Sequence, residues 1–267
     1  MSPPAPPKPL PGSAPRPVLI LGGTTEANAL VSALGAHSGW RPVLSLAGVT
    51  RSPRLPAAEV RIGGFGGADG LEGWLREHGM RAVVDATHPF AVRISANARE
   101  SCRRLALPML RIERPAWQPI AGDDWHDASD MMAAAALLGD RPRRVLLTVG
   151  RKDLLPFRRR GLHRYLVRSV DPPPPELLPE GAAVLAARGP FTLDGERQLL
   201  RAEGIEWLVT KNAGGIAVSA KLQAARELGI PVAMVRRPDP PSAGACDLPA
   251  VPDWRDALSW LANLSGE

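Results

Sequence analysis

Short apolar runs alternate with helical stretches from residue 17 onward, and this alternation restricts the fold more than any other feature of the chain. The first half has strand-like runs at 18–21, 43–46, 60–62, 82–85 and 108–112, and helical patterns at 26–36, 71–77 and 91–105. Parallel strands need a crossover between them, and a helix usually supplies it. The pattern therefore predicts a parallel, doubly wound α/β sheet.

The alternation breaks at residues 114–127, where prolines and a glycine indicate a linker, and then begins again. Strand-like runs follow at 145–149, 165–168, 183–186, 207–210 and 232–235, with helical patterns at 129–138, 194–203, 217–228 and 254–264. We therefore expect an α/β protein with two Rossmann-like lobes, each with a parallel sheet, and an active-site cleft between them. The predicted parts are a disordered Pro-rich leader at 1–16, a first domain at 17–118 and a second at 119–267.

Several classes of protein are disfavoured by composition. No run of about 18 apolar residues occurs, so no membrane partner is expected. The leader lacks the apolar core of a signal peptide, which predicts a cytoplasmic protein. The two cysteines, Cys102 and Cys246, have no CxxC spacing and the histidines do not cluster, so no metal site is expected.

The charge balance favours an anionic partner. The formal net charge is +6, and only four of the 33 basic residues are lysine. Nucleic acid and a small molecule with phosphates or many carboxylates both fit such a charge. Aromatic residues make up only 4% of the chain, and no RNP or zinc-finger pattern is present. We therefore expect a small-molecule partner and no nucleic acid.

Ligands of open parallel sheets bind outside the carboxyl ends of the strands, so the residues at those ends are the candidates for function. The first strand is followed by Gly22, Gly23, Thr24, Thr25 and Glu26, where a helix begins. Two glycines and the free amides of a helix N-terminus suit a phosphate. The alternative is an ordinary strand–helix turn with a threonine cap.

The second strand is followed by Ala47, Gly48, Thr50 and Arg51, with no acid before Glu59. An acidic residue at this position selects NAD, whereas basic and hydroxyl groups suit the 2′-phosphate of NADP. The sequence therefore favours NADPH over NADH. The alternative is a solvated arginine in a loop.

Two further strand ends are unusual. Residues 63–67 read GGFGG, which allows the backbone to pass close to a flat or charged ligand; the alternative is a purely structural tight turn. Residues 85–91 read DATHPFA, a polar cluster that a core would not hold. His88 is a candidate proton donor or ligand hydrogen-bond donor. The alternative is that Thr87 or His88 caps the next helix, with Pro89 in its first turn.

In the second half, three strands end in cations. Arg151, Arg188 and Lys211 follow separate apolar runs, beside Gly189 and Asn212. Equivalent ends of parallel strands lie at one edge of a sheet, and converging cations suit carboxylates. The alternative for any one of these arginines is a solvated side chain.

Taken together, these stretches resemble the precorrin-6A reductase family over residues 18–238. The matching segments are GGTTEA at 22–27, SLAG at 45–48, GGFGG at 63–67, DATHPFA at 85–91, RPAW at 114–117, TVGR at 148–151, ARGPF at 187–191 and KNAGG at 211–215, followed by Lys221. DATHPFA and ARGPF are specific as a pair.

The resemblance implies reduction of one ring double bond of precorrin-6A to precorrin-6B, in cobalamin biosynthesis, with a hydride from NADPH and no metal or flavin. NADPH would bind the first lobe, at the first two strand ends and at Gly64, Phe65, Thr87 and His88. The polycarboxylate tetrapyrrole would contact Gly66, Gly67, Pro89 and Phe90, and also Arg151, Arg188, Gly189, Lys211 and Asn212. Lys211 and His88 are the catalytic candidates, and the proton source stays open among water, His88 and Lys211.

Two positions depart from the family pattern. Val49 stands where the family usually has arginine, so Arg51 would take over the 2′-phosphate, and Ala213 stands where serine is frequent. Two other functions remain: an NADH-dependent cobalt-precorrin-6A reductase and a non-catalytic NADP-binding regulator. We favour a monomer.

Overall fold

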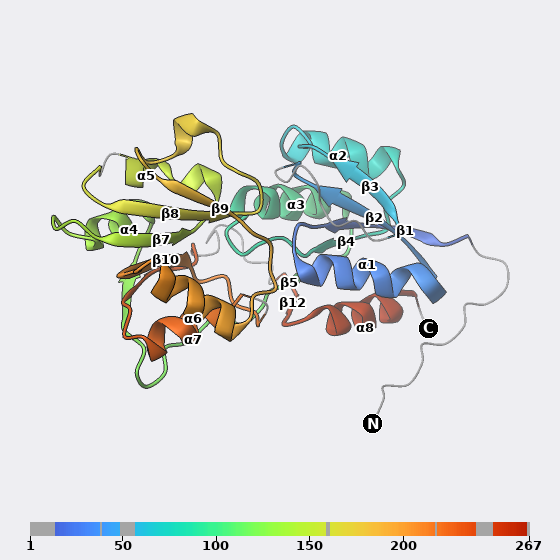
Figure 1. The fold of residues 1–267 in the computed structure, drawn as a ribbon. Helices are drawn as coiled ribbons and strands as arrows, with labels where there is room; N and C mark the ends of the chain where they lie inside the picture. The colour runs from blue at the N-terminus through green and yellow to red at the C-terminus, as the bar shows by residue number, and fades with distance from the viewer. Residues whose placement is uncertain are drawn as a thin grey trace, which may run out of the picture. The chain divides into compact units, whose positions relative to one another are not determined.

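The computed structural model describes residues 14–37, 39–48, 57–158, 161–216, 218–238 and 248–265. The chain divides into two compact units (Figure 1). The first consists of Met1–Arg114 together with Pro238–Glu267, and the second of Pro115–Arg237.

The first unit is built on a six-stranded sheet in the order β12-β5-β4-β1-β2-β3, in which every pairing is parallel. Its strands are β1 (Arg16–Leu21), β2 (Trp40–Leu46), β3 (Glu59–Ile62), β4 (Ala82–Asp85), β5 (Met109–Ile112) and β12 (Ala250–Val251). The strand order reverses at β1, so a topological switch point lies there, and this is where such sheets bind ligands.

Helices cover both faces of this sheet. Alternate residues of β1 point to opposite faces: Val18 and Ile20 belong to the core under α1 (Thr25–His37) and α8 (Trp254–Ser265). Leu19 and Leu21 belong to the core under α2 (Ala68–Glu77) and α3 (Val92–Leu105). A strand that is buried on both faces reads as a continuous apolar run, as residues 18–21 do.

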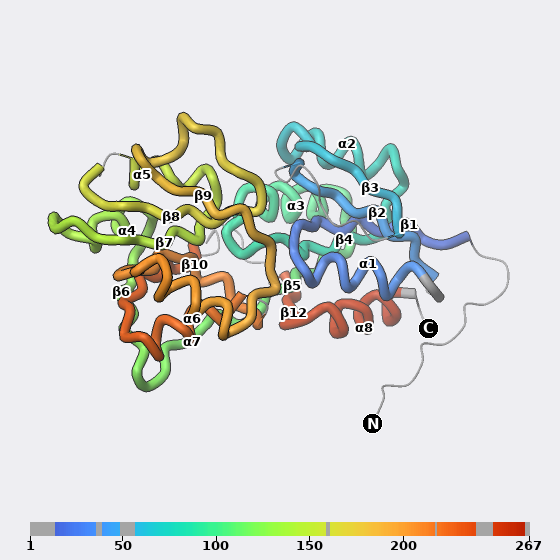
Figure 2. The backbone as a smooth tube through the Cα atoms, viewed as in Figure 1, coloured from blue at the N-terminus to red at the C-terminus, as the bar shows by residue number. Residues whose placement is uncertain are grey.

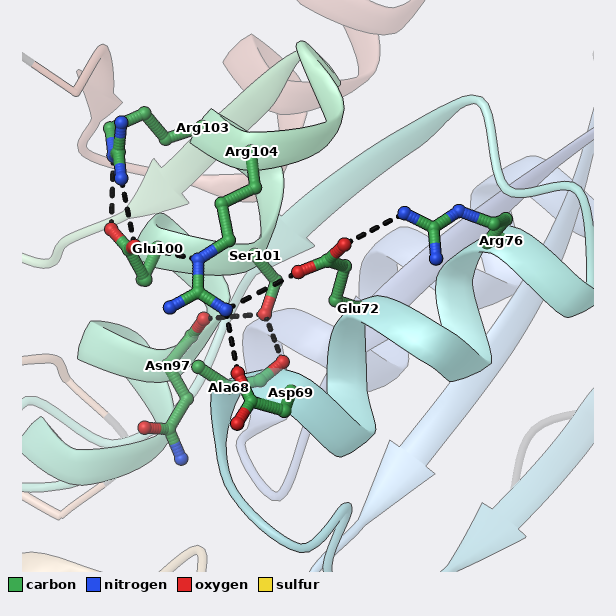
Figure 3. A network of polar contacts seen from close by, with 9 residues as sticks. All are labelled: Ala68, Asp69, Glu72, Arg76, Asn97, Glu100, Ser101, Arg103 and Arg104. Carbon is green, nitrogen blue, oxygen red and sulfur yellow. Dashed lines mark hydrogen bonds and ion pairs between the residues drawn. The ribbon is translucent and has the colours of Figure 1, made fainter.

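A surface network of charged side chains joins α2 to α3 (Figure 3). Arg104 contacts Asp69 at 2.6 Å and Glu100 at 2.7 Å, measured between nitrogen and oxygen. Each exposed pair contributes little to stability. Below them the buried Ser101 hydroxyl donates to the Ala68 carbonyl at 2.8 Å, which fixes the first residue of α2. The network thus anchors the helix that follows the glycine-rich loop.

The second unit repeats the architecture, with a parallel sheet in the order β6-β11-β10-β7-β8-β9. Its strands are β6 (Trp125–Ala128), β7 (Arg144–Thr148), β8 (Arg164–Ser169), β9 (Ala183–Ala186), β10 (Trp207–Lys211) and β11 (Val232–Val235). α6 (Leu193–Ala202) and α7 (Ala220–Glu227) pack side by side on one face, while α4 (Met131–Leu137) and α5 (Leu155–Arg158) cover the other (Figure 1). The predicted α/β class with two parallel sheets is confirmed.

The end of the chain belongs to the first unit, and the prediction that the second domain continues to residue 267 is wrong. β12 pairs with β5, and α8 packs beside α1, as Figure 2 shows in red and blue. The Trp40 indole donates to the Leu261 carbonyl at 2.9 Å. The second unit also begins at Pro115 rather than at residue 119.

Short elements account for the other differences. β6, β12 and α5 have two to four residues each, too few to show a period, and β6 lies partly in the predicted linker. The predicted leader falls almost wholly outside the described residues. Within them, no helix has both the length and the apolar character to cross a membrane.

Candidate functional site

The turn between β1 and α1 presents backbone amides. Gly23 has φ +105°, a conformation that favours glycine, and no atom lies within 4 Å of the place where a side chain would begin. The Thr24 hydroxyl accepts from the Ala27 amide at 3.2 Å and donates to the Ala86 carbonyl at 2.6 Å. The amides of Thr25 and Glu26 find no partner among the described residues. The turn is therefore both a threonine cap and a place where an anion can bind.

The acidic side chain in the first turn of α1, Glu26, is neutralised by an arginine. Glu26 Oε2 lies 2.9 Å from Arg114 Nη1, and both side chains are mostly buried. Without Arg114, the carboxylate would oppose an anion at the start of α1. A narrow pocket lies beside this pair, lined by Thr24, Glu26, Ala86, Thr87, Pro89, Ile112 and Arg114.

The glycine-rich loop after β3 is held by Arg61. This guanidinium donates to the Gly63 and Gly64 carbonyls, each at 2.6 Å, and stacks on the Phe65 ring with 3.6 Å between Cζ and the ring centroid. Partial burial lowers the pKa of Arg61 from its ordinary value. Arg61 has no carboxylate partner in the part of the chain that the structure describes. The loop is thus ordered by a cation of its own strand.

The polar residues after β4 satisfy one another. Asp85 is fully buried; its Oδ1 accepts from the Thr87 hydroxyl at 2.6 Å and its Oδ2 from Arg111 Nη1 at 2.7 Å. Arg111 also donates to Ser95 at 2.8 Å. This network braces the carboxyl end of β4 from below.

The alternative interpretation of residues 85–91, in which Thr87 or His88 caps α3, is wrong. The helix begins at Val92 with Ala91 at its N-cap position and no side-chain bond there, so neither Thr87 nor His88 caps it. Pro89 is buried in the turn that precedes the helix. His88 Nδ1 accepts from the Phe90 amide at 3.3 Å, which leaves Nε2 as the protonated nitrogen of the neutral ring.

The end of β2 is only partly described. Ala47 and Gly48 are exposed directly after the strand, in register with the end of β3. The predicted cofactor residues Thr50 and Arg51 lie outside the described residues. The contact predicted for the 2′-phosphate therefore stays a prediction.

In the second unit, Lys211 ends β10 and pairs with an acid that the sequence analysis did not assign. Its Nζ lies 2.6 Å from Asp153 Oδ2, which also accepts from the Gly150 amide at 3.1 Å. Arg151 lies in the same segment and is half-buried, whereas Arg188, after β9, is exposed. The predicted cations therefore do follow parallel strands of one sheet, but one carries a counter-ion.

Asn212 shapes the turn after β10. Its side-chain oxygen accepts from the Trp117 amide at 2.8 Å, and its nitrogen donates to the Trp117 carbonyl at 2.9 Å. Arg237 donates to the Asn212 and Ala213 carbonyls at 2.9 and 3.2 Å. At Gly214, with φ +67°, a side chain would lie 2.3 Å from the Pro115 carbonyl oxygen. Asn212, predicted as a substrate ligand, thus has its amide engaged in holding this turn.

A second group of charged side chains lies near Trp117, which binds the same turn. Lys221 in α7 is 5% exposed, and its Nζ lies 5.3 Å from the centroid of the Trp117 ring. Arg168 of β8 and Glu196 of α6 form a buried pair at 2.6 Å, and Arg168 stacks on Phe191 at 4.1 Å.

Sequence reasoning missed Arg61, Asp153, Arg168, Glu196 and Arg237. Arg61 and Asp153 belong to no motif that the sequence makes recognisable, because each acts through a partner that only the fold brings close. Trp117 and Lys221 had a signal, since both belong to the segments that matched a family pattern, but no chemistry was attached to them.

No group of three or more His, Cys, Asp or Glu residues that could hold a metal ion occurs among the described residues. Cys102 lies on the buried face of α3, and burial raises the pKa of its thiol to about 12, which keeps it uncharged.

Comparison with known proteins identifies the family. Residues 17–262 match the family model described as "Precorrin-6x reductase CbiJ/CobK". The chain is 47% identical to the precorrin-6A reductase of Rhodococcus erythropolis over 93% of its own length and 98% of the relative's. It is 32% identical to the cobalt-precorrin-6A reductase of Priestia megaterium over 83% and 90%. A solved structure titled "CobK precorrin-6A reductase" superposes with a TM-score of 0.86 at 42% identity, over 93% of this chain and 96% of that one. The chain therefore belongs to the precorrin-6x reductase family.

Proposed function

We propose that the chain reduces a ring double bond of precorrin-6A to give precorrin-6B, with NADPH bound to the first unit and the ring carboxylates held by cations of the second. Membership of the family makes the chain an oxidoreductase of cobalamin biosynthesis that uses a nicotinamide cofactor. The observation that carries the finer proposal is the contrast between the strand ends: open amides in one unit, lysine and arginine in the other.

The first unit fits a dinucleotide. The amides of Thr25 and Glu26 point along the axis of α1, and Gly23 leaves room for a diphosphate to approach the backbone. Arg114 removes the repulsion that Glu26 would exert. The Thr87–His88 segment follows β4, which flanks the switch point together with β1, and the loop at residues 63–67 follows β3 at the edge of the same sheet.

The second unit fits a polycarboxylate. Arg151 and Arg188 offer guanidinium groups, which bind carboxylates in a bidentate manner. Lys211 lies at the end of the central strand β10, where Asp153 holds its ammonium in one position. A ring carboxylate that reaches Lys211 shares this ammonium with Asp153.

The reaction asks two things of the protein. The reduced nicotinamide supplies a hydride, and the protein orients the ring and delivers a proton to the neighbouring carbon. Arg151, Arg188 and Lys211 orient the ring through its carboxylates. Nothing in this scheme requires a metal ion.

The relatives favour the metal-free ring. The precorrin-6A reductase of Rhodobacter capsulatus is 46% identical to this chain, whereas the cobalt-precorrin-6A reductase of Salmonella typhimurium is 28% identical. The metal-free substrate is therefore the proposal, and the cobalt-loaded ring is the alternative.

One experiment tests the proposal. The protein is incubated without oxygen with precorrin-6A and NADPH, and the product is analysed by mass spectrometry for a gain of two hydrogens. Parallel reactions with NADH and with cobalt-precorrin-6A rank the cofactors and the rings by kcat/KM. A preference for NADH or for the cobalt-loaded ring would contradict the corresponding part of the proposal, and NADPH binding without turnover of either ring would indicate a regulator.

A further inference from the structure

The Lys221 side chain is almost completely buried, and its ammonium has no polar partner among the described residues. It lies in the first turn of α7 and is 5% exposed. Among the residues that the structure describes, no acceptor lies within hydrogen-bonding or ion-pair distance of its Nζ, and its neighbour is the face of the Trp117 ring at 5.3 Å. A buried charge without a partner lowers the free energy of unfolding, so the fold keeps Lys221 at the expense of stability.

The charges around Lys221 do not neutralise it. Arg168 from β8 and Glu196 from α6 face it, and these two are already paired with each other at 2.6 Å. Glu196 Oε2 is buried and has no hydrogen-bond partner. Burial and, secondarily, the Arg168 charge lower the pKa of Lys221 to about 7, while Glu196 acts in the opposite direction.

Lys221 lies behind the turn that carries the proposed substrate contacts. The Trp117 ring that it faces donates through Nε1 to the Gly215 carbonyl at 3.0 Å, and the Trp117 main chain is bound by Asn212. Trp117 therefore connects Lys221 to the Lys211–Gly215 turn, which lies at the carboxyl end of the second sheet.

We propose that Lys221 is the proton donor of the reduction. Hydride transfer from the nicotinamide breaks the ring double bond and leaves its electron pair on the neighbouring carbon. That carbon takes a proton from the Lys221 ammonium, directly or through one bridging water, and the resulting amine regains a proton from solvent. The inference rests on the proposed binding of the ring at the second unit.

The other basic residues of this region suit the task less well. Lys211 is engaged by the Asp153 carboxylate at 2.6 Å. The arginines cannot give up a proton in a protein. A lysine that burial brings close to neutral pH has the acidity that general acid catalysis requires.

The titration of Lys221 can be measured directly, because the chain contains only four lysines. Protein labelled with ¹³C at the lysine ε-carbon gives four signals, which are assigned by single Lys→Arg variants. The Lys221 signal is expected to shift with a midpoint near pH 7. A midpoint near 10 or above would overturn the proposal, and this measurement needs neither substrate nor cofactor.

Turnover provides the second test. Lys221→Met is expected to lower kcat by about a hundredfold or more, the usual contribution of a general acid, without weakening NADPH binding. Lys221→Arg keeps the charge without a transferable proton and is expected to be as slow. The exposed Lys152→Met serves as the matched control and should retain wild-type turnover.

The outcomes separate the inference from the function on which it rests. Wild-type kcat should fall as pH rises through about 7, since the acid form is required, and this dependence should vanish in Lys221→Met. Wild-type turnover in Lys221→Arg would show that charge alone suffices and would overturn the proton-donor role. If Lys221→Met does not fold, its melting curve reveals this, and the arginine variant and the titration still decide. Failure of the wild-type protein to reduce precorrin-6A would instead contradict the proposed function.

Discussion

The two units share an architecture but differ in how they complete the carboxyl ends of their strands. In the first, each acid at a strand end has an arginine partner, Glu26 with Arg114 and Asp85 with Arg111, and what remains available is backbone. In the second, Arg151, Arg188 and Lys211 follow the strands, with Lys211 paired to Asp153, and the nearby Lys221 lacks a counter-ion among the described residues. The difference teaches that the parallel sheet decides where a ligand binds, while the loops decide which chemistry it meets.

Among the tests of this difference between the two units, the largest effect is expected at Lys211. Lys211→Ala should lower kcat/KM for precorrin-6A by about 10- to 100-fold, because a charge-assisted hydrogen bond contributes roughly 1.5–3 kcal/mol. NADPH affinity, measured by calorimetry, should stay at the wild-type value. Lys152→Ala is the control, because Lys152 is exposed and is adjacent in sequence to Asp153, the partner of Lys211. Normal turnover, or loss of the fold, would contradict the proposal that the second unit binds the substrate through Lys211.

A second test addresses the backbone surface of the first unit. Gly64→Val places a side chain where no protein atom lies within 4 Å, so the melting temperature should hardly change. If NADPH passes close to this backbone, its dissociation constant should rise about tenfold or more, equivalent to at least 1.4 kcal/mol. Gly73→Ala, at an equally open position in α2, should leave binding intact. Equal affinities for Gly64→Val and wild type would move the cofactor away from this loop.

A third test asks whether Arg51 in the first unit distinguishes NADPH from NADH. Arg51→Ala should raise the NADPH dissociation constant by about tenfold, the lower end for a charged contact to phosphate, and leave NADH binding unchanged. Fluorescence titration with both cofactors measures the ratio. Similar losses for NADPH and NADH would indicate that Arg51 does not recognise the 2′-phosphate.

The smallest expected effect concerns stability. The folded-state pKa of Lys221, about 7, lies below its ordinary value of 10.5, so the unfolded chain binds more protons between these pH values. The penalty from Lys221 is therefore complete below about pH 7 and disappears as pH rises toward 10.5. Lys221→Met should raise the melting temperature by about 2–4 °C for each kcal/mol recovered, most at pH 7 and least near pH 10. A gain that does not change with pH would contradict the assigned titration.

Strand ends were the predictable part of this molecule. Residues 18–21, 82–85 and 232–235 could be predicted as strands because each is a short continuous apolar run, the pattern of a strand buried on both faces. The cations of the second sheet followed from position alone, since parallel strands bring equivalent ends to one edge.

Partners were the part that could not be predicted. Asp153 and Lys211 are separated by 57 intervening positions with no regular pattern, and Arg61 donates to backbone carbonyls, which every residue has. The return of the C-terminus was missed because β12 has only two residues, too short to show alternation. Side-chain pairing depends on proximity in the folded protein, and no periodicity in a single sequence indicates which distant residues will meet.

That return has a consequence for biosynthesis on the ribosome. The second unit is continuous in the chain, whereas the first is interrupted by it and receives β12 and α8 only after the second unit has been translated. Until residues 250–265 emerge, β5 has an open edge and the Trp40 indole lacks the Leu261 carbonyl. In a nascent chain the second unit is therefore complete before the first, and a stop codon between residues 238 and 249 would leave the second unit intact and deprive the first of β12 and α8.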